Sequence, residues 1–360
     1  MLPHKPYAIK PDYTMKKLLT GLCIVAVSIN ANSVLAQAGA GTKYGPKQQA
    51  YVDSIKNSDY KWTMPILGKK ASGKGFDLPY NSGIMLNTLF AKQKVLISDL
   101  KVGFNDMQPV PLEFIKFGDV VAKTQSVTVR PDVWILPFLD LYAIGGFSTA
   151  QTNVSIVEPF VMNTNAKFHG NTFGLGTTFA AGYHGFISII DFNHTWTHMD
   201  KISGTISANM VDARFGKNFL MKDKPYRSIA VWIGAQGFFI NRTTEGSINL
   251  ADLKTDASLA DMESIANETA GWYQNLTPAQ KIVMKQLAQA VINKINGGGD
   301  KDVIVHYSLN KRPTSDWSMC VGGQFQFSHS WQVRTEVGFL GGRSSLLLSA
   351  NYRFRMFKKH

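Results

Sequence analysis

The sequence contains little cysteine and no apolar run long enough for a membrane-spanning helix. Cys23 and Cys320 are the only cysteines among its 360 residues. We expect Cys23 to be removed with a signal peptide, which excludes a disulfide framework within one mature chain. The apolar run at residues 18–29 is shorter than the roughly 20 residues that a transmembrane helix requires. The sequence therefore offers no helix to hold the chain in an inner membrane.

The basic charge of the chain is not concentrated in one segment. The formal net charge is +13, but basic residues are spread along the sequence. Only short pairs stand together, such as Lys69 with Lys70 and Lys358 with Lys359. A nucleic-acid partner favours basic residues clustered on one helix or strand. We therefore expect no nucleic-acid binding, and a surface that faces water or acidic lipid headgroups.

The N-terminal region has the order of features that a secretory signal peptide requires. Lys16 and Lys17 form a positive start, residues 18–29 are apolar, and Val34, Leu35 and Ala36 precede Gln37. Small or branched residues at this place are typical of a cleavage site. Residues 1–36 are therefore predicted to be a signal peptide with some upstream residues, and the mature chain to begin at Gln37.

The last part of the chain, residues 317–357, alternates strictly between apolar and polar residues. In residues 331–339, Trp331, Val333 and Val337 share one face, and Gln332 and Arg334 share the other. Period-two alternation indicates strands. The segments run for about 11 residues, which is twice the usual strand in a globular protein and enough for a tilted strand to cross a bilayer.

The same alternation recurs upstream. Together with the three C-terminal segments it predicts nine strands between Val127 and Phe354, the first six at residues 127–135, 139–150, 172–183, 186–197, 204–215 and 228–241. A long loop is expected at residues 152–170. Residues 84–90 and 95–104 are ambiguous, because each fits a strand and either fits a plug. The polar residues 37–81 are predicted to be a periplasmic segment with one short helix near residues 48–56, and residues 82–360 the strand-forming domain.

A helical insertion interrupts the strands at residues 252–299. Thr277, Pro278 and Gln280 have the spacing of a capping box with proline at the first helical position. The helix that follows carries a broad apolar stripe, formed by Ile282, Val283, Leu287, Val291, Ile292 and Ile295. Such a stripe must be covered. We expect this helix to pack against a barrel mouth or against a helix within residues 257–271, and so to limit access to the interior.

The number of strands follows from parity. Bacterial barrels use an even number of strands, with short periplasmic turns and longer outer loops. Nine strands therefore need an odd number before Val127, which gives about ten or twelve in all. With the last strand descending to the periplasm, the helical insertion lies outside. If residues 303–309 form a further strand, the insertion moves to the periplasmic side.

These strands, the signal peptide and the ending Tyr352, Arg353 and Phe354 resemble uncharacterised outer-membrane β-barrel proteins of Gram-negative bacteria. The resemblance extends from about Val127 to the end of the chain. It implies an all-β fold, a transmembrane antiparallel up-and-down barrel of about 10–12 strands with a helical insertion in one loop. It also implies a place in the cell outer membrane, with outer-membrane lipids and the barrel-assembly machinery as partners. No catalytic residue is carried over.

The polar face of the strands is expected to line the lumen. Its candidate residues are Arg130, Asp132, Asp140, Gln236, Gln324, Gln326, Arg334, Glu336, Asn351 and Arg353. Glu336 lies between Arg334 and Arg353 in strand order, so ion pairing across neighbouring strands is expected. Such residues form either a polar network that fills a narrow barrel or a lumen that binds or passes a polar solute.

Metal and catalytic sites find little support. Asp191, His194, His198 and Asp200 are close in sequence, but alternation puts both histidines on the face that meets lipid. We expect no metal, no cofactor and no enzyme activity. A channel or transporter for a small or amphipathic solute is the favoured function. A structural or surface-binding barrel is the alternative, and an outer-membrane lipid hydrolase has lower weight.

Overall fold

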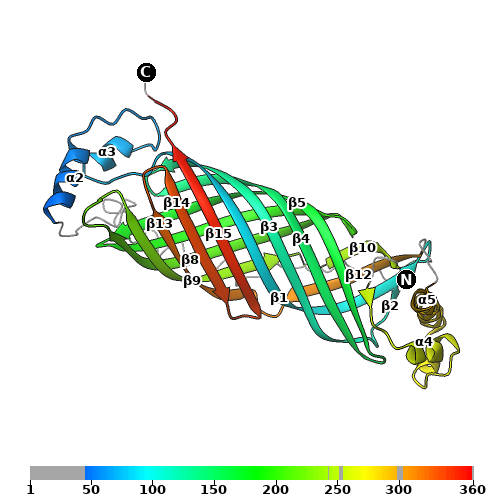
Figure 1. Cartoon of the computed structure of the whole chain (residues 1–360). Coiled ribbons are helices and arrows are strands. Elements are labelled where there is room, and N and C mark those ends of the chain that lie inside the picture. The colour runs from blue at the N-terminus through cyan, green and yellow to red at the C-terminus, as the bar shows by residue number, and fades with distance from the viewer. Residues whose placement is uncertain (1–44, 242, 251–253, 298–302, 359–360) are drawn as a thin grey trace, which may run out of the picture.

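The structure is a computed structural model that describes residues 45–241, 243–250, 254–297 and 303–358 (Figure 1). The predicted signal peptide lies outside the described residues. In chain order the elements are α2 (Pro46–Lys56), α3 (Gly68–Ser72), β1 (Ser82–Phe104), β2 (Val110–Pro111), β3 (Lys116–Leu136), β4 (Leu139–Glu158), β5 (Met162–Tyr183), β6 (Phe186–Met199), β7 (Ile202–Ser203), β8 (Thr205–Leu220), β9 (Ser228–Ile240), β10 (Thr243–Asn249), β11 (Lys254–Thr255), α4 (Leu259–Ala266), η2 (Tyr273–Asn275), α5 (Pro278–Ile295), β12 (Ile304–Pro313), β13 (Trp317–Gln326), β14 (Trp331–Phe339) and β15 (Arg343–Phe354).

Ten antiparallel strands close into a barrel. Their order is β1, β3, β4, β5, β6, β8, β9, β13, β14 and β15, and β15 pairs with β1 along twelve residues, from Ser82 opposite Phe354 to Gln93 opposite Arg343. Closure leaves no open sheet edge at membrane depth. One strand, β1, thus precedes the nine predicted strands, and the prediction of ten or twelve strands is confirmed with ten.

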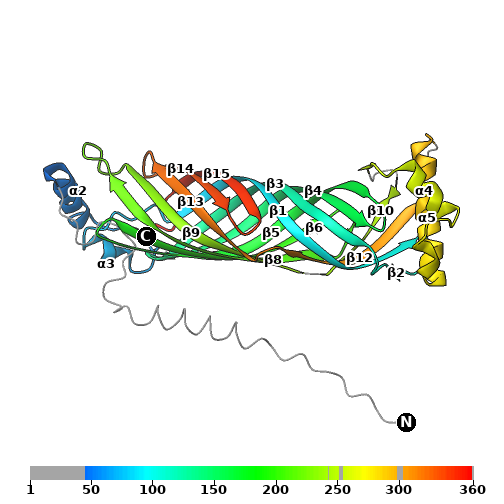
Figure 2. The same cartoon turned by 90° about the horizontal axis from the view of Figure 1, so that it is seen from below.

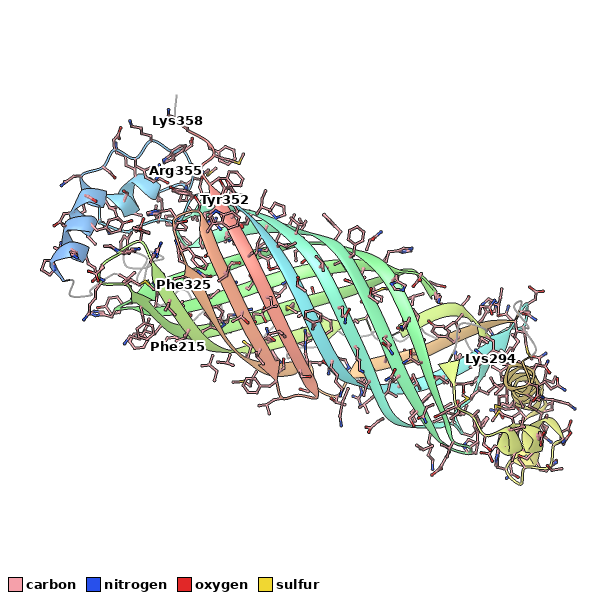
Figure 3. All side chains as sticks on the ribbon, in the orientation of Figure 1. Phe215, Lys294, Phe325, Tyr352, Arg355 and Lys358 are labelled. Carbon is pink, nitrogen blue, oxygen red and sulfur yellow. The ribbon has the colours of Figure 1, made fainter. Side chains whose placement is uncertain are left out.

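The alternation of the sequence appears as two faces of the barrel wall. Outward-facing side chains of the closed section are large and apolar, and Phe215, Phe325 and Tyr352 in Figure 3 belong to this exterior. Val337 is 46% exposed, whereas Glu336 beside it is 2% exposed. An apolar exterior on a closed barrel is what a bilayer selects, because lipid cannot satisfy polar groups. The chain is therefore an outer-membrane β-barrel, as the sequence predicts.

Four strands continue far beyond this apolar belt. β1, β3, β4 and β5 have 23, 21, 20 and 22 residues. In this extension the polarity of the two faces is reversed, because Ile156, Met162 and Phe168 are buried inside while polar side chains such as Lys167 face outward. The section beyond the belt is thus built like a water-soluble sheet, with an apolar interior and a solvated exterior.

Two sequence interpretations are corrected by the extension. Residues 152–170 are not a long loop, since β4 and β5 pair from Leu139 opposite Phe179 up to Ile156 opposite Met162. The ambiguous residues 84–90 and 95–104 form one strand, β1, and Asp99 with a φ of 54° lies where its register to β12 shifts. The plug alternative is therefore wrong for these residues.

The strands β10 and β12 complete the extension on its other side. β12 pairs with β1 from Val95 opposite Pro313, and β10 pairs with β12. Residues 304–309 thus belong to a strand, as the sequence allowed, but this strand adds no further crossing of the barrel wall. β12 and β13 run in the same direction and follow each other after a short break, so β12 does not change the parity.

The helical insertion stands across the end of the extension (Figures 1 and 2). The predicted capping box is present, with Thr277 accepting from the Gln280 backbone N–H and Gln280 accepting from that of Thr277. Val283, Met284 and Val291 of α5 are buried in one apolar cluster with α4 and the ends of the long strands. The predicted packing of α5 is therefore confirmed, although Ile282 and Ile295 remain exposed. Among the described residues, no helix is long and apolar enough to cross a membrane.

The N-terminal helices lie at the opposite end, beside the C-terminal tail (Figure 1). The predicted short helix is confirmed as α2. The segment after it is tied to the tail, because the Thr63 N–H donates to the Phe357 carbonyl at 2.8 Å and Asn81 donates to the Met356 carbonyl at 2.7 Å. The turns at this end after β3 and β5 are short, as periplasmic turns of bacterial barrels are, and we propose that this end faces the periplasm and the helical insertion the outside.

Candidate functional site in the barrel lumen

The polar residues selected from the sequence lie on the inward face of the wall. Asp132, Asp140, Gln236, Glu336, Asn351 and Arg353 are buried, and Arg130, Gln324, Gln326 and Arg334 are half-buried. All except Gln236 and Glu336 also line one lumen cavity, which is described below. The strands bring these residues together because every second side chain of each strand points inward.

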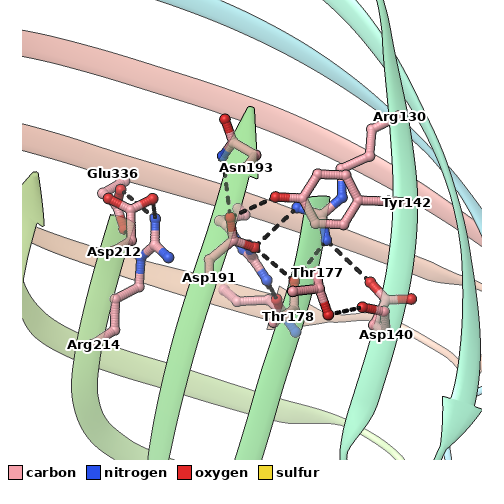
Figure 4. Close-up of polar contacts among 12 residues, drawn as sticks. Arg130, Asp140, Tyr142, Thr177, Thr178, Asp191, Asn193, Asp212, Arg214 and Glu336 are labelled. Carbon is pink, nitrogen blue, oxygen red and sulfur yellow. Dashed lines mark hydrogen bonds and ion pairs between the residues drawn. The ribbon is translucent and has the colours of Figure 1, made fainter. Parts of the chain in front are cut away.

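One group of charges surrounds Arg130, and we call it the Arg130 cluster (Figure 4). Arg130 Nη2 donates to Asp140 Oδ2 at 3.1 Å, and Arg130 Nη1 lies 3.5 Å from Asp191 Oδ2. The Tyr142 ring lies under the guanidinium at 3.4 Å, and its hydroxyl donates to Asp191 Oδ1 at 2.6 Å. Thr178 donates to the other oxygen of Asp191 at 2.6 Å. Both carboxylates of the cluster are thus bound by cationic or hydroxyl donors.

A second group, the Arg214 cluster, joins β8 to β14. Arg214 Nε donates to Glu336 Oε2 at 2.6 Å, and Arg214 Nη2 donates to Asp212 Oδ2 at 3.1 Å. Trp232 Nε1 and Gln236 Nε2 donate to the two oxygens of Glu336 at 2.7 and 2.8 Å. The carboxylate of Glu336 is therefore fully occupied by side chains of β8 and β9.

The expected ion pairs of Glu336 with Arg334 and Arg353 are not formed. The partner of Glu336 is Arg214. Arg214 lies on β8, and β9 and β13 stand between β8 and β14, the strand of Glu336. Arg353 instead binds Asp132, with Nη2 to Oδ1 at 2.8 Å. The reason is geometric, because a ten-stranded barrel is narrow and long side chains meet across the lumen as well as along the wall.

Glycines make room for the large side chains of the lumen. Trp232 lies opposite Gly216 on one neighbouring strand and Gly322 on the other. A Cβ on Gly322 would lie 2.8 Å from the Trp232 indole nitrogen. Gly83 likewise separates Asp132 from Arg353 in register, and a Cβ there would lie 2.7 Å from Asp132 Oδ2. The Arg214 cluster and the Asp132–Arg353 pair depend on these close approaches.

Arg334 differs from the other lumen arginines near it. Its Nη2 and Nε atoms donate to Gln324 Oε1 at 2.9 and 3.3 Å, and its guanidinium lies 5.5 Å from the centre of the Trp232 ring. Within the part of the chain that the structure describes, Arg334 forms no ion pair with a carboxylate. Its protein partners among the described residues are thus an amide oxygen and a ring face.

A cavity of about 490 Å³ lies between these charges and the N-terminal helices. Its inner wall is polar and contains Arg130, Arg334 and Asn351. Its outer wall is formed by α2 and the segment that precedes β1, with Phe76 and Leu78 among the lining residues. The cavity therefore has a charged floor in the barrel and a partly apolar roof at the periplasmic end.

The roof is attached to the barrel rim through His329, in the turn between β13 and β14. Tyr51 of α2 donates to Asp77 Oδ2 at 2.7 Å and lies 2.9 Å from His329 Nε2. The His329 ring stacks with both Tyr80 and Tyr226, and each tyrosine ring centroid lies 5.7 Å from that of His329. Burial, and next the charge of Asp77, raise the pKa of Tyr51 well above its usual range. The phenol is thus held neutral where α2 meets the barrel.

The sequence interpretation missed Asp212 and Arg214. The signal was present, because Asp212 and Arg214 alternate with Val211, Ala213 and Phe215 in β8. No described group of three or more His, Cys, Asp or Glu residues is placed to hold a metal ion.

His194, one of the two histidines considered as metal ligands, has other partners. His194 Nδ1 lies 2.7 Å from Asn209 Oδ1, its Nε2 lies 3.0 Å from Ser207 Oγ, and its ring meets the Trp196 ring edge-on. Asp191, on the inward face, belongs to the Arg130 cluster instead.

No protein-family model matches the chain, and no curated protein matches it. Among solved structures it is similar to the transport unit of the autotransporter AIDA-I from Escherichia coli, at 9% identity and a TM-score of 0.36, covering 87% of this chain and 100% of that chain. The translocator domain of NalP from Neisseria meningitidis has 9% identity and a TM-score of 0.33, covering 86% and 94%. The toluene transporter TbuX from Ralstonia pickettii has 6% identity and a TM-score of 0.28, covering 91% and 100%. These likenesses are too distant to transfer a function.

Proposed function

We propose that the chain is a gated outer-membrane channel for a small solute and not an enzyme. The observation that carries this proposal is the cavity of about 490 Å³ inside the barrel, lined by charged side chains of the wall. Pockets of this size hold small molecules, and a polar wall offers them exchangeable hydrogen bonds. Surrounding outer-membrane lipids and insertion by the barrel-assembly machinery belong to the same proposal.

Both ends of the barrel are covered, which favours a gated channel and not a pore that is always open. At the outer end the apolar cluster of α4, α5 and the strand ends covers the extension. At the periplasmic end α2 and the segment after it roof the cavity. A solute that crosses must displace or bypass both closures, so their packing should set the rate of passage.

Loosening the outer closure tests the proposal. Val291→Asp places a charge on a side chain that is 1% exposed in the apolar cluster, and an unpaired buried charge is costly. We expect this variant to fold its barrel normally and to conduct more than the unchanged chain in planar bilayers, with faster swelling of proteoliposomes in small sugars.

Ile282→Asp is the matched control. It adds the same charge on the same helix, but Ile282 is 51% exposed, so conductance should stay at the level of the unchanged chain. Equal conductance of the Val291→Asp and unchanged chains, with barrels shown intact by heat-modifiable mobility, would contradict a gate at this end.

A surface-binding barrel is the second candidate. Ile282 and Ile295 of α5 are 51% and 45% exposed at the outermost end of the molecule. Exposed apolar side chains on a helix suit contact with a partner. If Ile282→Asp abolishes binding of whole cells to a surface while permeability is unchanged in every variant, this candidate replaces the channel.

A further inference from the structure

We propose that the lumen cavity is a binding site for a small amphipathic monocarboxylate, with its carboxylate held by Arg334. The inference rests on the proposed function and names the class of solute that the lumen takes. The juxtaposition that carries it is an arginine without an ion pair beside an unpartnered, buried amide, facing a partly apolar wall.

Among the described residues, no carboxylate lies within ion-pairing distance of Arg334. Among the described lining residues, the cations are Lys56, Lys74, Arg130, Arg214, Arg334 and Arg353, and the carboxylates are Asp77, Asp132, Asp140 and Asp191. Arg130, Arg214 and Arg353 each pair with carboxylates. Glu336, one of the two carboxylates at Arg214, is bound by four donor atoms. A desolvated guanidinium is stabilised by an anion, and its planar fork fits a carboxylate in two places.

Asn351 supplies the second, independent observation. Its side chain is 2% exposed and lines the cavity, yet neither its Nδ2 nor its Oδ1 atom has a hydrogen-bond partner. In the register of β14 and β15, Asn351 lies opposite Gln332 and Ser349 lies opposite Arg334. Asn351 is thus the diagonal neighbour of Arg334 on the inward face, roughly 7 Å away by strand geometry. A buried amide of this kind is costly unless a ligand or water completes its bonds.

The remaining wall explains why the solute should carry an apolar body. Ala180, Ile187 and Ile189 line the cavity from β5 and β6, and Phe76 and Leu78 line it from the roof. A small inorganic anion would leave these apolar side chains exposed to water, whereas a short aliphatic or aromatic acid would cover them. The carboxylate then points at Arg334 and the hydrocarbon part lies under α2.

Benzoate is the probe that tests the site, and benzyl alcohol is its uncharged analogue. Calorimetric titration of the full chain in detergent micelles, with the titration of empty micelles subtracted, should detect benzoate and only weak binding of benzyl alcohol. Arg334→Gln should weaken benzoate binding at least about tenfold, because it removes the charge that fixes the carboxylate. Arg312→Gln removes the same charge from an exposed position on β12 and should leave binding unchanged.

Gln332→Glu is the second variant, for the case that Arg334→Gln harms folding. Gln332 also lines the cavity and lies two residues from Arg334 on the same face, so a carboxylate there should compete with benzoate for Arg334. Binding of benzoate that is equal in all variants, or equal binding of benzyl alcohol, would overturn the site. Permeation in proteoliposomes without benzoate binding defeats this inference alone. Arg334-dependent benzoate binding without permeation defeats the channel and leaves the site standing.

Discussion

Single residues decide how the lumen is filled, and Gly83 shows this most directly. It lies in β1 between Arg353 of β15 and Asp132 of β3, and these two side chains meet over its backbone at 2.8 Å. Any side chain at this position would stand between them. Glycine weakens the strand slightly at this position, but it permits a buried ion pair between β3 and β15 across β1.

Gly83→Ala should break this pair. The added Cβ would lie 2.7 Å from Asp132 Oδ2, so one carboxylate and one guanidinium lose their geometry while remaining buried. We expect a loss of about 1–3 kcal/mol in the free energy of unfolding, measured by urea titration in lipid vesicles. Gly145→Ala is the control, because a Cβ there meets nothing within 4 Å. Equal stability of both variants would show that the pair tolerates the methyl group.

At the scale of the element, the sequence predicts which face of a strand a side chain lies on better than it predicts which residue that side chain contacts. Alternation is local, so the inward positions of Arg130 and Arg334 could be predicted from single strands. The partner of Glu336 could not be predicted, because its contact with Arg214 depends on the diameter and stagger of the closed barrel. The extension was missed for a different reason. Outside the belt the apolar residues turn inward, as with Ile156, so a search for apolar exteriors stops too early.

The two faces of β14 should respond differently to the same substitution. Val337→Arg places a charge on the apolar exterior, where arginine costs about 2–4 kcal/mol near the bilayer midplane. Gln332→Arg places it on the inward face at the cavity, out of contact with lipid. We expect a much lower folding yield in lipid vesicles for Val337→Arg, scored by heat-modifiable mobility. Similar yields for the two variants would mean that the assignment of faces is wrong.

At the scale of the whole molecule, each end of the barrel has its own closure. The outer closure packs through apolar side chains, and the periplasmic closure is held by hydrogen bonds and stacked rings around His329. The two should therefore fail under different conditions. A charge buried among the apolar side chains should weaken the outer closure, whereas ionisation of the polar groups should weaken the periplasmic closure.

Alkaline pH should release the periplasmic closure. Burial and Asp77 raise the pKa of Tyr51, so its phenol stays neutral while α2 is docked on the barrel rim. When α2 is released, the Tyr51 phenol ionises near the usual pKa of about 10. The stabilisation is complete below that pH and is lost as the pH rises above it. Protease cleavage within residues 45–80 should therefore increase above about pH 10. Tyr51→Phe should flatten this rise, and a variant with the same steep pH dependence would exclude Tyr51 as its cause.

The reversed polarity of the extension also fixes how far the molecule stands above the lipid. β1 continues for 12 residues beyond Lys92, the first charged side chain outside its apolar stretch, to Phe104. At about 3.3 Å per residue and a tilt of about 45°, this lifts the strand ends about 30 Å. α4 and α5 are thus carried beyond the lipid headgroups on a rigid stem. A large particle that approached the membrane from this side would touch these helices before it reached the lipid.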